Sequence, residues 1–208
     1  MSYLGFSSKW ASYLAKTHHL DEEKQLEITY AIEIITLNGL NVFLTLTLAW
    51  VLGVFGGTLV CLLTSAAFRH NAGGGHSESP WLCAMATIII FPLLALMASN
   101  ICIWPTPYLN ILSLLSVFIG FIIIFLYAPV DNIKAPITSR ARRIRLRKLA
   151  FWVMLTISLI ILGLSFSGWQ QAAYFRLCIV FSLLWFSFNL TPWGQRLWHF
   201  IDNIGLTI

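Results

Sequence analysis

Two long stretches without a charged residue constrain this chain more than any other feature. Residues 34–68 form a run of 35 that lacks Asp, Glu, Lys and Arg, and residues 79–130 form a second run of 52. A helix needs about 20 residues to cross the hydrocarbon core of a bilayer, so the second run has room for two crossings. Its break is predicted at Trp104-Pro105-Thr106-Pro107, because two prolines cannot continue a helix. Membrane strands are excluded, since they run about 10 residues and alternate apolar with polar positions.

The rest of the chain fits the same class, since only 10% of its residues are charged and 58% are apolar. We predict an all-α, polytopic membrane helix bundle of about six spans, with four crossings plus re-entrant or interfacial helices as the alternative. The second span is short, which indicates a helix that extends into the turn at residues 53–57 or one that does not cross fully. The predicted spans are Ile34–Leu52, Thr58–Phe68, Trp81–Trp104, Tyr108–Ala128, Leu149–Ser167 and Ala173–Leu190.

Basic residues gather on one side of these spans. A dense run lies between the fourth and fifth spans, and short loops rich in Lys and Arg stay in the cytoplasm. Counting spans from this run puts Arg69, the N-terminal lysines and Arg196 on its side and leaves only Arg176 toward the outer face. We therefore expect a multi-pass membrane protein with both termini on the cytoplasmic side. The run consists of Arg140, Arg142, Arg143, Arg145, Arg147 and Lys148, with Lys134 just upstream.

Both ends of the chain have the pattern of helices that lie in the headgroup region. Apolar residues recur at helical spacing from Phe6 to Leu14 and again from Trp193 to Ile201, each set beside charged residues. No repeat or separate soluble domain is evident, so we predict one membrane domain, 1–208. It comprises an interfacial N-terminal helix at 1–27, the spans at 28–192 and an interfacial C-terminal segment at 193–208. The spans enclose a polar loop at 69–83 and a basic loop at 129–148.

The polar loop joins a histidine, a glycine run and a cysteine. Ser79 suits the N-cap and Pro80 the first helical position, so Cys83 is expected in the first turn of the third span. A helix N-terminus favours a thiolate, and the glycines at 73–75 let His76 approach it. A thiolate that attacks a carbonyl and an imidazole that protonates the departing amine are what cysteine acyl transfer needs. The loop therefore predicts catalysis by His76 and Cys83 on the cytoplasmic side.

Other interpretations of this loop stay open. His70, His76, Glu78 and Cys83 offer a set of zinc ligands, although their spacing matches no familiar finger and no Cys-x-x-Cys follows. The four cysteines are scattered, and three lie inside apolar spans, where thiols act as small hydrophobes. The rival function is a small membrane transporter or peptide exporter without covalent catalysis. That rival predicts that Cys83→Ser and His76→Ala are tolerated.

Two motifs, in this order, resemble the accessory gene regulator B (AgrB) membrane peptidases. The first runs from Arg69 to Cys83, with Ala72-Gly73-Gly74, then His76, then Cys83 after six intervening residues. The second is Ala128-Pro129-Val130-Asp131-Asn132-Ile133-Lys134-Ala135-Pro136-Ile137, which the arginine-rich run follows. Chain length and multi-span hydropathy agree as well, so the resemblance covers nearly the whole chain.

The resemblance implies a cysteine endopeptidase of the bacterial cytoplasmic membrane, with Cys83 as nucleophile and His76 as general acid/base. Its substrate would be a quorum-sensing signalling propeptide, which loses its C-terminal tail before the remainder cyclises as a thiolactone or lactone. Gly75 departs from the family, in which this position often carries a larger residue. The expected partners are the propeptide and membrane lipids, with a homodimer left open and with no cofactor, metal or nucleic acid.

Further residues are expected to support this chemistry. Glu78 would orient His76, and Asn71 would help to hold the oxyanion. The main expected role of the basic residues is to set topology and bind anionic headgroups. The resemblance also implies that they help to dock the acidic tail of the propeptide. The supporting set is Arg69, Asn71, Gly73, Gly74 and Glu78, and the docking set is Lys134, Arg140, Arg142, Arg143 and Arg145.

Overall fold

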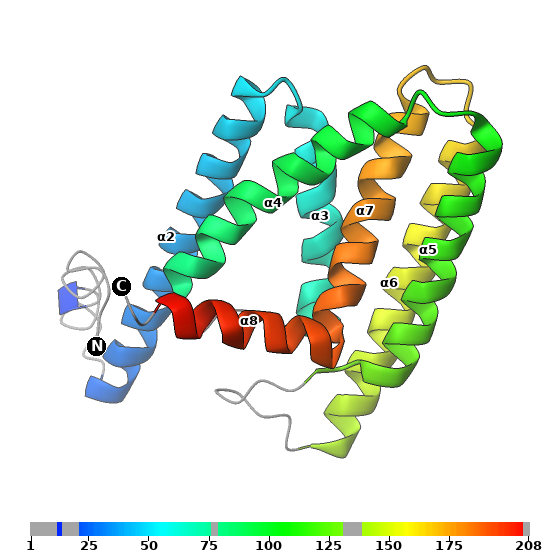
Figure 1. Cartoon of the computed structure of the whole chain (residues 1–208). Coiled ribbons are helices and arrows are strands. Elements are labelled where there is room, and N and C mark those ends of the chain that lie inside the picture. The colour runs from blue at the N-terminus through cyan, green and yellow to red at the C-terminus, as the bar shows by residue number, and fades with distance from the viewer. Residues whose placement is uncertain (1–11, 14–20, 76–78, 131–138, 206–208) are drawn as a thin grey trace. The chain divides into compact units, whose positions relative to one another are not determined.

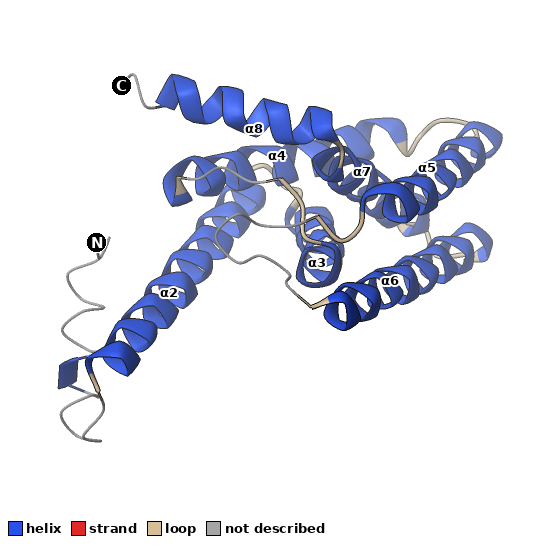
Figure 2. Cartoon of the chain, turned by 90° about the horizontal axis from the view of Figure 1, so that it is seen from below, coloured by secondary structure: helices blue, strands red, loops and turns tan. Residues whose placement is uncertain are grey.

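A computed structural model describes residues 12–13, 21–75, 79–130 and 139–205 of the chain. This described part contains seven α-helices and no strand (Figures 1 and 2). Five of the helices, α2 and α4 to α7, are long and apolar enough to cross a membrane. The prediction of an all-α polytopic bundle is therefore confirmed. The helices are α2 (Glu22–Val51), α3 (Phe55–Ala72), α4 (Pro80–Ile101), α5 (Thr106–Tyr127), α6 (Arg140–Phe166), α7 (Ala172–Leu190) and α8 (Pro192–Gly205).

The chain divides into two compact units, residues 1–44 and residues 45–208, which are described separately. In the first unit the described residues from Glu22 onward belong to α2. This helix begins before the predicted start at Ile34, because residues 22–33 include the good helix formers Glu, Lys, Gln, Leu and Ala. Most of the predicted interfacial helix at 1–27 lies outside the described residues. The single membrane domain stays a prediction.

Helix α3 corresponds to the second predicted span and is not among the five apolar candidates. Its 18 residues span about 27 Å, slightly less than the hydrocarbon core. It begins inside the glycine-rich turn, as its short apolar run indicated. The turn itself ends α2 in a Schellman motif, in which Gly53 has φ 72° and the N–H groups of Gly53 and Val54 donate to the carbonyls of Trp50 and Ala49.

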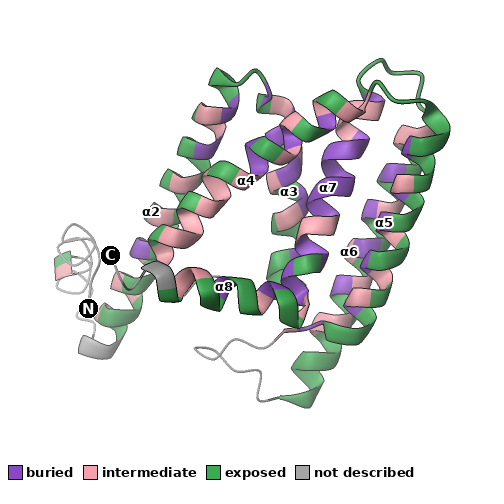
Figure 3. Cartoon of the chain, viewed as in Figure 1, coloured by how far each residue is buried: buried purple, intermediate pink, exposed green. Residues whose placement is uncertain are grey.

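Helix α7 is the centre of the second unit and contacts α3, α4, α5, α6 and α8. Most of its residues are buried, whereas α4, α5 and α6 expose large apolar side chains on their outer sides (Figure 3). Against α3, the Phe186 ring stacks on Phe68 with centroids 4.6 Å apart, and the Ser182 hydroxyl donates to the carbonyl of Cys61 at 2.8 Å. Such an apolar exterior is typical of helices that face lipid.

Two glycines let helices of the second unit approach one another closely. A Cβ added at Gly57 of α3 would stand 2.9 Å from Sγ of Cys178 and would also meet the Tyr174 hydroxyl. A Cβ at Gly120 of α5 would stand 2.7 Å from Cε of Met154. Small residues at contacts between membrane helices allow close packing without a side chain in the way.

The basic run corrects one prediction. The loop expected at 129–148 ends at Ser139, and residues 140–148 form the first turns of α6. The Ser139 hydroxyl caps the helix by accepting the backbone N–H of Arg142 at 3.4 Å. Arginine is a good helix former, so α6 continues beyond its apolar part. Arg147 reaches α5, where its guanidinium lies 4.9 Å from the ring centroid of Phe125 and donates to the carbonyl of the same residue.

Helix α8 runs across one end of the second unit, where α3, α5 and α7 end and α4 and α6 begin (Figure 1). At the other end Arg176 is 3% exposed and donates to Asn110 of α5 and Ser165 of α6, both at 2.8 Å. Arg69, the basic turns of α6 and Arg196 thus lie at the α8 end, with Arg176 opposite. This distribution of charge is the one that the sequence predicted.

Helix α8 has three faces. Trp198 and Gly194 are buried against the bundle, while Trp193 and Phe200 are 70% and 63% exposed. A separate exposed side carries polar residues. A helix with one apolar and one polar exposed face suits the headgroup region, where the sequence predicted this segment to lie. The polar side consists of Arg196, His199 and Asn203.

Candidate active site

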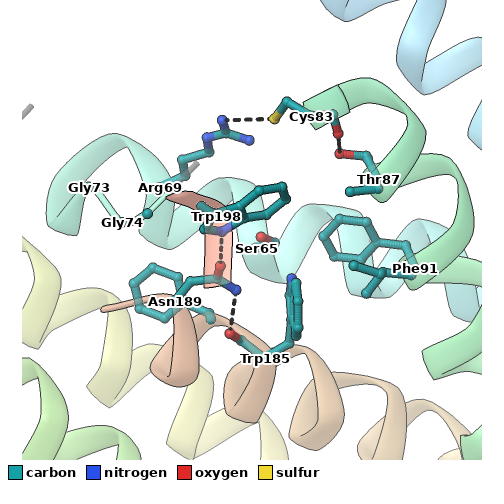
Figure 4. Close-up of a pocket in the computed structure, with 14 residues that line it drawn as sticks. Ser65, Arg69, Gly73, Gly74, Cys83, Thr87, Phe91, Trp185, Asn189 and Trp198 are labelled. Atoms are coloured by element: carbon teal, nitrogen blue, oxygen red, sulfur yellow. Dashed lines mark hydrogen bonds between the residues drawn. The ribbon is translucent and has the colours of Figure 1, made fainter. Parts of the chain in front are cut away.

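A pocket lies at the α8 end of the second unit, between α3, α4, α7 and α8 (Figure 4). It holds about 520 Å³ of space, counting the part that opens to the outside. Polar groups and aromatic rings share its wall. The polar side chains are Ser65, Arg69, Cys83, Thr87 and Asn189, and the aromatic ones are Phe91, Trp185, Phe186 and Trp198.

Cys83 borders this pocket as the fourth residue of α4. The helix begins as predicted, with Ser79 as N-cap and Pro80 at the first position, where its missing N–H would have no helical partner. The Cys83 N–H donates to the Ser79 carbonyl at 3.1 Å, and the Thr87 hydroxyl donates to the Cys83 carbonyl at 2.9 Å. The thiol is half-buried and sits in the turn where the helix dipole is positive.

Arg69 approaches the thiol from the last turn of α3. Its Nη2 donates to Sγ of Cys83 at 3.7 Å (Figure 4). A guanidinium and a helix N-terminus both stabilise negative charge on sulfur. The sequence predicted positive charge at this surface, and the structure adds direct contact between the two side chains.

The glycine run forms another part of the wall. Gly73 and Gly74 have φ of 72° and 135°, a region that residues with a Cβ rarely adopt. The Val130 N–H donates to the Ala72 carbonyl at 2.9 Å, and a Cβ at Gly73 would stand 2.6 Å from the Val130 carbonyl oxygen. The two motifs that carry the family resemblance therefore touch, although 44 residues separate them in the sequence.

The remaining predicted site residues either lie outside the described part of the chain or do not line the pocket. His76, Glu78 and Lys134 lie outside the described residues, so the approach of His76 to Cys83 stays a prediction, as does the zinc set. Asn71 donates to the Ala67 carbonyl at 3.2 Å within α3 and does not line the pocket. The four arginines expected to dock the tail are exposed on α6, and none of the described residues of α6 lines the pocket. They are Arg140, Arg142, Arg143 and Arg145.

Asn189 and Trp198 are among the pocket residues to which the sequence analysis assigned no role in the site. Asn189, in the last turn of α7, accepts the Trp198 indole N–H on Oδ1 at 2.6 Å. Its carbonyl accepts the Gly75 N–H at 2.9 Å. Each of the two residues is 7% exposed. Asn189 could have been identified from the sequence, because a polar residue inside an apolar span is a functional candidate. Trp198 could not, because its pattern is only that of an interfacial residue.

Comparison with known proteins places this site in context. The family Accessory gene regulator B matches residues 7–190. The accessory gene regulator protein B of Staphylococcus aureus (strain bovine RF122 / ET3-1) is 34% identical over 157 residues, which cover 76% of this chain and 79% of that protein. An AgrB-like protein of Clostridium perfringens (strain 13 / Type A) is 30% identical over 190 residues, 88% of each chain. No solved structure matches this chain.

Proposed function

Since this chain belongs to the accessory gene regulator B family of membrane proteins, we propose that it is a membrane-embedded cysteine endopeptidase acting on a signalling propeptide. It removes the C-terminal tail of that peptide through an acyl-enzyme on Cys83. The observation that carries this proposal is the contact of the Arg69 guanidinium with the Cys83 thiol in the wall of a pocket. Among the described residues no other cysteine combines these features. Cys61 and Cys178 are buried, and Cys102 lies at the far end of α4.

The first half of the proposed reaction is cleavage. The Cys83 thiolate attacks the scissile carbonyl, and the bond to the tail nitrogen breaks as His76 gives that nitrogen a proton. The tail leaves as a free amine, and the rest of the peptide stays on sulfur as a thioester. Arg69 and the first turn of α4 support this step because both stabilise the attacking thiolate.

The second half decides the product. A Cys or Ser side chain of the bound peptide attacks the thioester carbonyl, Cys83 leaves, and a thiolactone or lactone ring results. Water attacking the same carbonyl gives a linear acid. Exchange of one thioester for another is nearly balanced in energy, so ring formation requires a positioned nucleophile and little water. The aromatic wall of Phe91, Trp185 and Trp198 supports the exclusion of water.

We also propose that the pocket faces the cytoplasm, with both termini on the same side. Arg69, the basic turns of α6 and Arg196 gather at the α8 end of the bundle. Segments rich in Lys and Arg stay inside the cell. On that face the exposed arginines of α6 dock the acidic tail of the propeptide near the membrane surface.

The test is co-expression with the cognate propeptide and mass spectrometry of the products. We expect the wild-type chain to remove the tail and to release a product lighter by one water than the linear acid. Cys83→Ser and His76→Ala should each stop tail removal while the protein still inserts into the membrane. Cys102→Ser is the matched control, because it makes the same change at the opposite end of α4, away from the pocket. Unchanged processing by Cys83→Ser would overturn the proposal and favour a transporter.

A further inference from the structure

Asn189 ties together three elements that the chain order keeps apart. Its backbone carbonyl accepts the Gly75 N–H at 2.9 Å, which holds the end of the glycine run. Its side chain accepts the indole N–H of Trp198 in α8 at 2.6 Å and donates to the Trp185 carbonyl of α7 at 2.7 Å. The asparagine is 7% exposed, so these bonds form with little competition from water.

The Trp198 ring lies directly against the same glycine. A Cβ added at Gly75 would stand 3.0 Å from Cδ1 of Trp198, 3.3 Å from the Asn189 carbonyl oxygen and 3.4 Å from Cα of Gln195. The backbone at Gly75 is therefore held between α7 and α8, where a side chain would require its neighbours to shift by a few tenths of an ångström. Figure 4 shows the indole and the asparagine facing the pocket from the side of α7 and α8.

The corner between α7 and α8 fixes this arrangement. The Thr191 hydroxyl accepts the Gly194 N–H at 3.2 Å and so caps the first turn of α8. Gly194 packs on the end of α7, where an added Cβ would stand 2.8 Å from Cα of Asn189 and 2.9 Å from the Phe188 carbonyl carbon. Only glycine allows α8 to turn this sharply onto α7, and the turn brings Trp198 to Asn189.

We propose that Asn189 and Trp198 are positioning residues for the reaction, so that docking of α8 on α7 sets the place of the glycine run. This inference rests on the proposed function, because the chain continues from Gly75 directly into the proposed general acid, His76. Three consecutive glycines have many backbone conformations, and a proton donor works only within hydrogen-bond reach of the leaving nitrogen. The hydrogen bond from the Gly75 N–H to Asn189 and the packing of the Trp198 ring against Gly75 restrict the backbone conformations of the glycine run before the substrate binds.

The role differs from that of Arg69. Arg69 touches the sulfur, so it acts on the reactivity of the thiol. Asn189 and Trp198 contact the glycine run, and in the described part of the chain neither donates or accepts a hydrogen bond with Cys83. A variant that weakens their contact should therefore slow cleavage and leave the reactivity of the thiol alone.

The test uses the full-length protein in vesicles of anionic phospholipid. Trp198→Phe keeps an aromatic ring and removes the N–H donor. We expect it to lower kcat for tail removal about tenfold, with KM unchanged, as the loss of one buried hydrogen bond predicts. The rate of Cys83 alkylation by a small maleimide should stay within about twofold of wild type. Trp193→Phe is the matched control, since it makes the same change on the exposed side of α8 and should alter neither rate.

A second pair of variants separates positioning from simple loss of folding. Asn189→Ala should slow cleavage at least as much as Trp198→Phe, and the double variant should be no slower than Asn189→Ala, because both substitutions break one contact. Wild-type kcat in Trp198→Phe would overturn the inference, and so would equal losses of cleavage and alkylation. Processing by Cys83→Ser would instead overturn the proposed function itself, so the two failures are distinguishable.

Discussion

At the scale of single residues, the kind of cation beside Cys83 matters as much as its charge. A guanidinium is planar and holds its N–H donors in a fixed arrangement, whereas an ammonium is a compact point charge on a flexible stem. The Nη2 of Arg69 lies 3.7 Å from the sulfur, across from the first turn of α4. The geometry suits a donor that stays in place while the thiolate forms.

Replacing Arg69 should therefore change the chemistry of the thiol. We expect Arg69→Gln to lower both the alkylation rate of Cys83 at neutral pH and the rate of tail removal, by about tenfold each. Arg69→Lys should have rates between those of Arg69→Gln and wild type, because lysine keeps the positive charge and loses the planar arrangement of donors. His70→Gln is the control, since His70 is exposed on the same turn of α3 and does not line the pocket. Equal alkylation rates in all four proteins would contradict this account.

The features of this site that depend on neighbouring residues could be predicted from the sequence. The contacts between residues far apart in the chain could not. Ser79 and Pro80 predicted the start of α4 correctly, because caps and first-turn prolines act on their immediate neighbours. The contact of Arg69 with Cys83 depends on how α3 and α4 cross. The bond from Trp198 to Asn189 depends on a corner that Gly194 permits. No spacing in one sequence specifies either.

At the scale of helices, polarity predicted where elements break better than where they begin. The break predicted at residues 104–107 lies at residues 102–105, since α4 ends at Ile101 and α5 begins at Thr106. Helices α2 and α6 begin at Glu22 and Arg140, well before the predicted spans that start at Ile34 and Leu149. Hydropathy marks the part of a helix that suits lipid, while capping and helix propensity decide how far the helix extends beyond it.

The helical basic turns of α6 carry a prediction of their own. Changing Arg142, Arg143 and Arg145 together to Gln should raise KM for the propeptide about tenfold and leave kcat unchanged, because the three exposed charges attract the acidic tail without reaching the pocket. The measurement is tail removal over a range of peptide concentrations, in vesicles of neutral lipid. A propeptide whose tail carboxylates are replaced by amides is the control and should not distinguish the two proteins. An unchanged KM would leave these residues a role in topology alone.

At the scale of the whole molecule, the placement of charge gives a test of orientation. In a variant whose four cysteines are replaced by alanine, a new cysteine at Gly168, between α6 and α7, should react with an impermeant maleimide in intact cells. A new cysteine at Arg140, at the α8 end, should react only after the membrane is opened. Gly168 suits this purpose because nothing lies within 4 Å of an added Cβ there. The reverse pattern of labelling would place the pocket outside the cell.

The course of α8 across the pocket has a consequence for when the protein becomes active. A ribosome makes Arg69 and Cys83 long before it makes Trp198, and α8 can fold back onto α7 only after the corner at Gly194 has emerged. A nascent chain that has inserted α3, α4 and α7 therefore has the side of the pocket that holds Arg69 and Cys83 before it has the wall that Trp198 supplies. If α8 positions the glycine run as we propose, we expect chains that end before α8 to remove the tail more slowly than the full-length protein does.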